Sequence, residues 1–155
     1  MPQSLKQKAL NNAYSLLRQR PRSVHEMRAR LKLKGYDGDI IDDVVTGLKK
    51  EGELDDAKFA KLWVDARISF NPMGELVLRQ ELKAKGVNET IIDATLAEAL
   101  KTYDEYDVAL KMAGEQFGRF AKLDKRKAMK RMYDFLVRRG FKFDVVERVI
   151  EEITK

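Results

Sequence analysis

The chain of 155 residues contains no cysteine, and this absence removes several classes of function. Disulfide bridges, cysteine-ligated zinc sites and thiol nucleophiles all require the missing side chain. The single histidine, His25, has no second histidine or cysteine with which to build a zinc site, and we do not interpret it as a catalytic residue. We therefore expect a protein without a metal or other cofactor.

Long apolar runs and glycine-rich phosphate loops are also missing. No segment approaches the roughly 20 apolar residues that span a bilayer, and the polar residues 1–8 resemble neither a secretory signal nor an anchor. Together with the lack of cysteine, this predicts a cytoplasmic protein that makes no membrane contact. No glycine motif typical of nucleotide binding occurs, so nucleotide hydrolysis has no recognisable apparatus.

Proline and glycine are scarce, with 3 and 9 residues respectively, and this composition favours helices over a turn-rich β fold. Adjacent acids such as Asp42 and Asp43 point in different directions on a helix and do not converge on a substrate. The sequence shows no group of residues that could act together as acid, base, nucleophile or metal ligands. We therefore predict that the chain is not an enzyme.

Positive charge is present in excess and is unevenly distributed. The chain has 31 lysines and arginines against 25 acids, which gives a net charge of +6. Basic residues gather in residues 6–34, where Glu26 is the only acid, and again in residues 122–142. This distribution favours attraction to nucleic acid, to an acidic protein surface, or to both.

A threefold repeat organises the chain around Gly35, Gly86 and Gly140, which lie about 50 residues apart. Glycine accepts the left-handed conformation that ends a helix, and the basic residue before each glycine suits the negative end of the helix dipole. An apolar residue stands four positions before each glycine and another stands eight before, which is the spacing of one helix face. These residues are Leu31 and Met27, Leu82 and Leu78, and Leu136 and Met132.

Each glycine is also followed by an apolar helix, which opens near Ile40, Ile91 or Val145. Three further helices are predicted ahead of these units, at residues 5–18, 55–67 and 104–117. Each repeat therefore contains three helices. We place the three repeats at residues 1–50, 51–101 and 102–155.

Capping residues support the predicted helix starts. Ser23 and Glu26 have the spacing of a capping box, in which each side chain satisfies a backbone donor of the other residue. Asp55 and Asp104 are predicted to cap helices, because carboxylates accept hydrogen bonds from open helix N-termini. Pro72 fits the first position of another helix.

In the order and spacing of their motifs, the repeats resemble the RecX family over nearly the whole chain. The central repeat carries the most specific match. Its matching residues are Leu54-Asp55-Asp56, Phe59-Ala60, Val64, Arg67, Arg79-Gln80-Glu81-Leu82 and Lys85-Gly86-Val87. The first repeat matches through Lys34-Gly35-Tyr36, and the third through Arg138-Arg139-Gly140-Phe141.

The resemblance implies an all-α fold of three tandem three-helix repeats, similar to helix-turn-helix units, in an elongated, curved arrangement. It also implies a regulatory protein that binds RecA filaments on single-stranded DNA. Such a protein would mainly inhibit the recombinase, ATPase and coprotease activities of RecA, and so affect DNA repair, recombination and the SOS response. Such inhibition could come from bridging neighbouring RecA subunits or from blocking filament extension, and both alternatives stay open. We expect a monomer.

Basic residues outside the apolar stripe are the candidate contacts, because they could line one basic face. We expect them to meet an acidic RecA surface, DNA phosphates, or both. The candidates are Arg28, Lys32, Arg79, Lys83, Lys85, Arg138, Arg139 and Lys142.

Two other functions stay open at this point. Three-helix units with positive charge are also found in stand-alone helix-turn-helix DNA-binding proteins, although no separate dimerisation segment is evident. A small helical enzyme whose site is assembled from distant loops is the third possibility. Sequence-selective binding of duplex DNA without RecA would favour the first of these alternatives.

Overall fold

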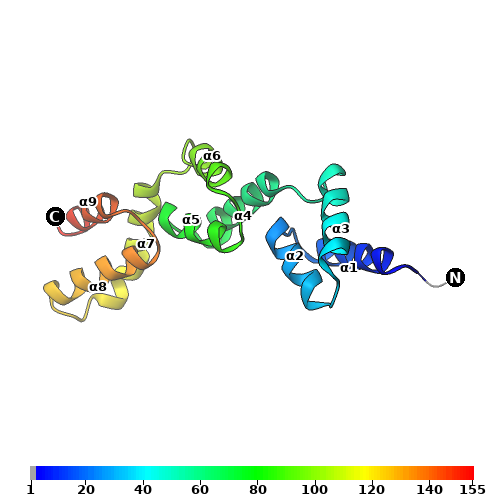
Figure 1. Cartoon of the computed structure of the whole chain (residues 1–155). Helices are drawn as coiled ribbons and strands as arrows, with labels where there is room; N and C mark the ends of the chain where they lie inside the picture. The colour runs from blue at the N-terminus through cyan, green and yellow to red at the C-terminus, as the bar shows by residue number, and fades with distance from the viewer. Residues whose placement is uncertain (1–2) are drawn as a thin grey trace. The chain divides into compact units, whose positions relative to one another are not determined.

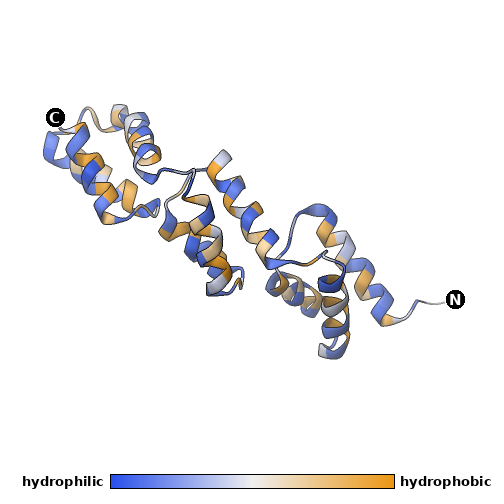
Figure 2. Cartoon of the chain, turned by 90° about the horizontal axis from the view of Figure 1, so that it is seen from above, coloured by the Kyte–Doolittle hydropathy of each residue, from blue (hydrophilic) through white to orange (hydrophobic). Residues whose placement is uncertain are grey.

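The structure is a computed structural model that describes residues 3–155. Within these residues it contains nine α-helices and no strand (Figure 1). The helices are α1 (Leu5–Gln19), α2 (Val24–Leu33), α3 (Gly38–Lys50), α4 (Asp56–Phe70), α5 (Glu75–Ala84), α6 (Glu89–Ala99), α7 (Glu105–Phe120), α8 (Lys125–Arg138) and α9 (Phe143–Ile153). Most helices carry both hydrophobic and hydrophilic residues along their length (Figure 2), as expected for helices that bury one face.

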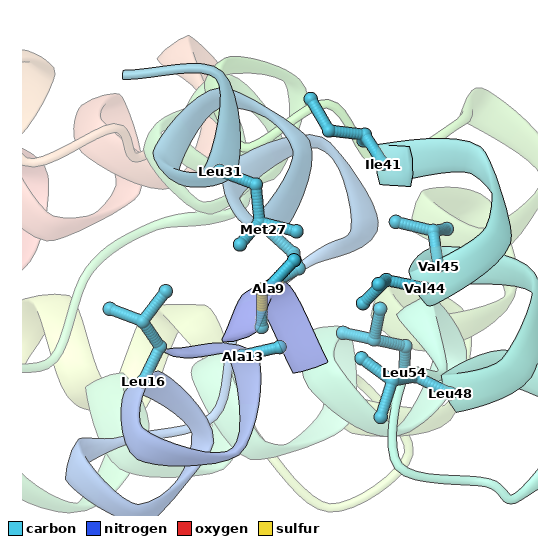
Figure 3. Close-up of a cluster of buried hydrophobic side chains, with 10 residues drawn as sticks. All are labelled: Ala9, Ala13, Leu16, Met27, Leu31, Ile41, Val44, Val45, Leu48 and Leu54. Carbon is cyan, nitrogen blue, oxygen red and sulfur yellow. The ribbon is translucent and has the colours of Figure 1, made fainter. Parts of the chain in front are cut away.

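The first three helices pack around a hydrophobic core (Figure 3). Helix α1 presents Ala9 and Ala13, one turn apart and fully buried, so its backbone can approach α2 and α3 closely. Met27 and Leu31 from α2 and Leu48 from α3 fill the space opposite them. Each large apolar side chain buried in this way contributes roughly 1.5–3 kcal/mol relative to an exposed one.

The last three helices repeat this arrangement. Ala109 and Ala113 are fully buried on α7, and α7, α8 and α9 pack against one another (Figure 1). Met132 and Leu136 on α8 correspond in sequence to Met27 and Leu31 on α2. The apolar stripe predicted ahead of the turn glycines is therefore buried in both groups.

The contacts divide the chain into two compact units, and the middle helices contribute to both. One unit comprises Met1–Trp63 and Leu82–Ile92, and the other comprises Val64–Glu81 and Asp93–Lys155. Buried apolar residues on α4, α5 and α6 include Val64, Leu82 and Ile92.

The turn glycines end the second helix of each repeat, as predicted. Gly35, Gly86 and Gly140 have positive φ angles of 92°, 77° and 89°. Each glycine N–H donates to a carbonyl three residues earlier, and the following N–H donates to a carbonyl five residues before it. This pair of bonds is the Schellman motif, which glycine favours because it has no Cβ to clash in the left-handed region.

Most predicted caps are confirmed. Ser23 and Glu26 form both hydrogen bonds of a capping box. Asp55 accepts hydrogen bonds from the N–H groups at the start of α4, and Asp104 accepts one at the start of α7. The prediction for Pro72 is wrong, since α5 begins three residues later at Glu75.

Candidate functional site

The candidate basic residues lie on the second helix of a repeat or, in the second and third repeats, also on the segment that follows it. Arg28 and Arg79 occupy equivalent positions on α2 and α5, seven residues before their turn glycines. Arg28 donates to Asp42 on α3 at 2.7 Å, and Arg79 donates to Asp93 on α6 at the same distance. The structure therefore repeats one ion pair between the second and third helices of two repeats.

This repeated ion pair is absent from the third repeat for a simple reason. Tyr133 on α8 stands where the arginine would be, and its ring stacks on Phe143 at a centroid distance of 6.4 Å. An aromatic contact thus links α8 to the start of α9. The candidate cations are consequently not arranged in the same way in all three repeats.

Lys85 and Lys83 lie in the same unit as Arg28 and Lys32. Lys85 forms an ion pair with Glu26 at 3.3 Å, and its ammonium lies 4.9 Å from the centre of the Trp63 ring. Lys83 pairs with Glu89 at 3.0 Å. Acidic partners in the chain itself therefore hold both lysines.

Arg79, Arg138, Arg139 and Lys142 lie in the other unit. Lys142 and Arg79 share the Glu75 carboxylate, at 2.7 Å and 3.6 Å. Arg139 donates to the Asn71 side chain at 3.1 Å and lies 5.2 Å from the centre of the Phe135 ring. Arg79 and Lys142 are thus brought together on one acid, while Arg139 is held nearby by different groups.

Two candidates differ from the rest. Lys32 on α2 and Arg138 on α8 are exposed, and neither forms an ion pair within the part of the chain that the structure describes. Lys32 also lines a shallow pocket of about 700 Å³ between α2 and α3, together with Arg28 and Tyr36. These two cations are the candidates whose full charge faces solvent.

Lys85 and Lys142, whose acidic partners lie in another repeat, belong to connections between successive repeats. At the first junction, the start of α2 meets the Lys85–Gly86 turn. The buried Ser23 hydroxyl donates to the Lys85 carbonyl at 2.6 Å, and the Val24 N–H donates to Asp56 at 2.9 Å. A Cβ on Gly86 would overlap the side chain of His25, so glycine is required here for space as well as for its φ angle.

The second junction repeats this arrangement at the start of α5. The Gly74 N–H donates to the Arg139 carbonyl at 2.7 Å, and the Glu75 N–H donates to the Glu105 carboxylate at 2.5 Å. Asp56 and Glu105 are each the first residue of the first helix of the next repeat. In both junctions, therefore, a carboxylate at that position accepts the first N–H of the preceding repeat's second helix.

Electrostatics differ between the junctions. Burial by itself raises the pKa of Glu26, but hydrogen bonds from Arg20, the Ser23 N–H and Lys85 outweigh burial and lower the pKa from 4.5 to about 2. Burial raises the pKa of Glu105, and the hydrogen bond from the Glu75 N–H only partly offsets it. The first junction thus stabilises a carboxylate ion, whereas the second disfavours one.

The sequence singled out these cations but missed their intramolecular role. Lys85 pairs with an acid 59 positions away, which no local spacing can indicate. The only sequence signal was the lone acid, Glu26, within the basic residues 6–34. An isolated acid among many cations is a reasonable candidate for a structural ion pair.

Residues 3–155 contain no ready-made metal site and no membrane-spanning helix. In this part of the chain, no group of three or more His, Asp or Glu residues is arranged to hold a metal ion. None of the described helices combines the length and apolar composition needed to span a bilayer.

Three successive family models match the chain. They describe the first, second and third three-helix domains of RecX and match residues 9–48, 55–96 and 103–150. Regulatory protein RecX of Prosthecochloris aestuarii is 33% identical over 99% of this chain and 98% of its own length. The Chlorobium phaeobacteroides protein of the same name is 34% identical, covering 94% of this chain and 93% of that protein.

Solved structures share the fold. The crystal structure of RecX from Lactobacillus salivarius superposes with a TM-score of 0.82 at 20% identity, covering 96% of each chain. A second crystal structure, of regulatory protein RecX, has a TM-score of 0.84 at 23% identity and covers 94% of this chain and 71% of that one. The predicted all-α fold of tandem three-helix repeats is confirmed, and with three domain matches and relatives above 30% identity the chain belongs to the RecX family of regulatory proteins.

Proposed function

We propose that this protein binds RecA filaments on single-stranded DNA and mainly inhibits their recombinase, ATPase and coprotease activities. Membership of the RecX family over nearly the full chain carries this proposal. The role is that of a regulator without chemistry of its own, so the hydrolysed ATP is bound by RecA. Regulation of this kind would limit recombination, DNA repair and the SOS response.

The surface charge supports such a partner. The net charge of +6 favours approach to a filament whose DNA is a polyanion. Among the candidate contacts, Lys32 and Arg138 are exposed and form no ion pair with any described residue, so binding would not require an internal pair to break. We therefore assign these two residues the leading role in filament contact.

The remaining candidates have a second role that complicates their use as probes. Lys85 and Lys142 stabilise the junctions, and Arg28, Arg79 and Lys83 form ion pairs with acids of their own repeats. Their replacement would change the stability of the chain as well as any contact with a partner. Contact of these residues and of Arg139 with RecA or DNA is proposed as secondary.

The test is RecA ATP hydrolysis on single-stranded DNA during titration with this protein. We expect inhibition at substoichiometric amounts, and we expect the double variant Lys32→Glu/Arg138→Glu to need roughly tenfold more protein for the same effect. The matched control is Lys49→Glu/Lys50→Glu, which makes the same charge change at the exposed end of α3. This control should inhibit like the unmodified chain.

Two outcomes would contradict the proposal. The absence of any effect on RecA hydrolysis would remove the filament as the target. Sequence-selective binding of duplex DNA at matched salt, without RecA, would favour a stand-alone DNA-binding protein. Equal inhibition by both double variants would leave RecA as the target but remove Lys32 and Arg138 from the contact surface.

A further inference from the structure

Helix α8 begins with an unusual concentration of positive charge. Its first seven residues include five cations, and its first turn contains no acid. A helix N-terminus carries partial positive charge, so cations there are destabilising and acids are preferred. Helices α2, α4, α5 and α6 follow that preference with Glu26, Asp56, Glu75 and Glu89.

Little inside the chain compensates this charge. Asp124 caps the helix by accepting the Lys127 N–H at 2.9 Å, and Lys130 lies 3.6 Å from Asp134. Within the described residues, no ion pair involves the other exposed cations of this region. They are Lys122, Lys125, Arg126, Lys127 and Arg131. A sequence that breaks a local rule without an internal compensation is typical of a functional surface.

An apolar pocket opens beside these cations, within the same unit. It has a volume of about 370 Å³ and lies between the end of α7, the start of α8 and the end of α9. Its lining includes Phe117, Phe120, Leu123, Met129 and Ile153. Phe117 is 54% exposed, so a large aromatic surface at the pocket mouth faces solvent.

The polar groups around the pocket are mostly occupied. The Thr154 hydroxyl donates to the Ile150 carbonyl at 2.8 Å, and Lys155 pairs with Glu152 at 3.0 Å. Lys125 is the lining cation that has no ion-pair partner among the described residues. The interior of the pocket therefore favours an apolar side chain, whereas its α8 rim favours an anion.

We propose that this α8 pocket binds a short acidic segment of a protein partner, with a bulky apolar side chain inserted and neighbouring carboxylates on the α8 cations. The volume lies at the lower end of the roughly 300–1,000 Å³ typical of ligand pockets, which suits one or two side chains. Methionine adapts its shape to different apolar groups, and Met129 and Met132 line this pocket. A phosphate backbone alone would leave the apolar lining unused. This inference does not require that the partner be RecA.

The test measures binding of a labelled synthetic peptide that alternates glutamate with leucine and phenylalanine, using fluorescence anisotropy and the full chain. We expect saturable binding, which Phe117→Ala and Lys125→Glu/Arg126→Glu each weaken roughly tenfold or more. The first control is Phe70→Ala, which removes a phenylalanine that is 88% exposed and lies outside the pocket. The second control is Lys49→Glu/Lys50→Glu. Both controls should bind within about twofold of the unmodified chain.

A further measurement tests where on the chain the peptide binds. In the unmodified chain, methyl resonances of Met129 and Ile153 should shift when the acidic peptide is added and should stay unchanged with a peptide that has lysine in place of glutamate. Failure of the acidic peptide to bind, or equal binding to all variants, would overturn the proposal. So would binding of a single-stranded oligonucleotide that the pocket variants abolish while the peptide gives no signal, because the surface would then serve nucleic acid. If the pocket variants lose peptide binding but inhibit RecA as strongly as the unmodified chain does, the pocket is supported and its partner is distinct from the filament.

Discussion

The two junctions make equivalent connections with different chemical groups. At the first junction a buried serine hydroxyl reaches the Lys85 carbonyl, whereas at the second the backbone N–H of Gly74 reaches the Arg139 carbonyl directly. Ser23 and Gly74 both stand 12 residues before a turn glycine, at Gly35 and Gly86. The residue at this position can therefore be a serine that donates from its side chain or a glycine that donates from its backbone. In both cases the carbonyl before the next turn glycine receives a hydrogen bond.

Charge separates the junctions further. The first is centred on an ionised acid, Glu26, with cations around it, and the second buries Glu105 near another acid, Glu75. We therefore expect the two junctions to respond differently to acid and to substitution.

The largest effect is expected at the glycines of the second junction. A Cβ on Gly140 would overlap the backbone nitrogen of Val77, which cannot move without shifting α5, so Gly140→Ala should destabilise the chain by about 3 kcal/mol or more. Gly35→Ala is the matched control, since Gly35 has a similar φ angle but open space around it. Gly35→Ala should lower the free energy of unfolding by only about 1–2 kcal/mol, the strain of placing alanine in the left-handed region. Urea unfolding followed by circular dichroism measures both, and equal losses would contradict the close packing of this junction.

An intermediate effect is expected for Glu26→Gln. The substitution leaves Arg20 and Lys85 without a carboxylate and weakens the capping box, so we expect a loss of about 2 kcal/mol in the free energy of unfolding. Glu105→Gln should change it by less than about 0.5 kcal/mol, because an amide oxygen still accepts the Glu75 N–H while a buried charge is removed. A larger loss for Glu105→Gln than for Glu26→Gln in the same urea experiment would reverse the comparison.

The smallest effect concerns pH. The pKa of Glu26 is depressed in the folded chain, so its contribution is complete above about pH 4.5 and is lost as the pH falls toward 2. Because Glu26 is partly exposed, solvent screens part of this interaction. We therefore expect the free energy of unfolding to fall by about 1–2 kcal/mol. The pKa of Glu105 is raised, so its contribution has the opposite sign: it is complete below the unfolded pKa and is lost as the pH rises through the folded pKa.

Stability profiles of three chains check this sign. Between neutral pH and about pH 2, Glu26→Gln should lose less stability than the unmodified chain. Glu105→Gln should lose more, because it lacks the opposing gain on acidification. Parallel profiles for all three chains would contradict the lowered pKa of Glu26 and the raised pKa of Glu105 in the folded chain.

Much of the local structure could be predicted from short-range patterns. The turn glycines, the stripe four and eight residues before them, and the caps at Ser23, Asp55 and Asp104 depend on residues within a few positions of one another. The Pro72 prediction failed because the N–H groups of Gly74 and Glu75 are satisfied by Arg139 and Glu105, far along the chain. Those contacts fix where α5 begins, and no local rule contains them.

The candidate contact residues show the same division. Their basic character and their positions outside the apolar stripe were evident from the sequence, and their contact with RecA or DNA stays a prediction. What the sequence could not indicate is that Lys85 and Lys142 each have an acidic partner in another repeat. Exposure and pairing depend on the positions of distant groups, so Lys32 and Arg138 could be distinguished from the other candidates only after folding.

The sequence by itself determined the helices, their turns and the three-part repeat, because helix periodicity, capping and the left-handed preference of glycine act over a few residues. The tertiary structure alone decided which charges are neutralised within the chain and which face solvent. It also decided that two turn glycines must accept close neighbours while Gly35 need not. The physical reason is that Coulomb and packing energies depend on distances between groups that the chain brings together only when it folds.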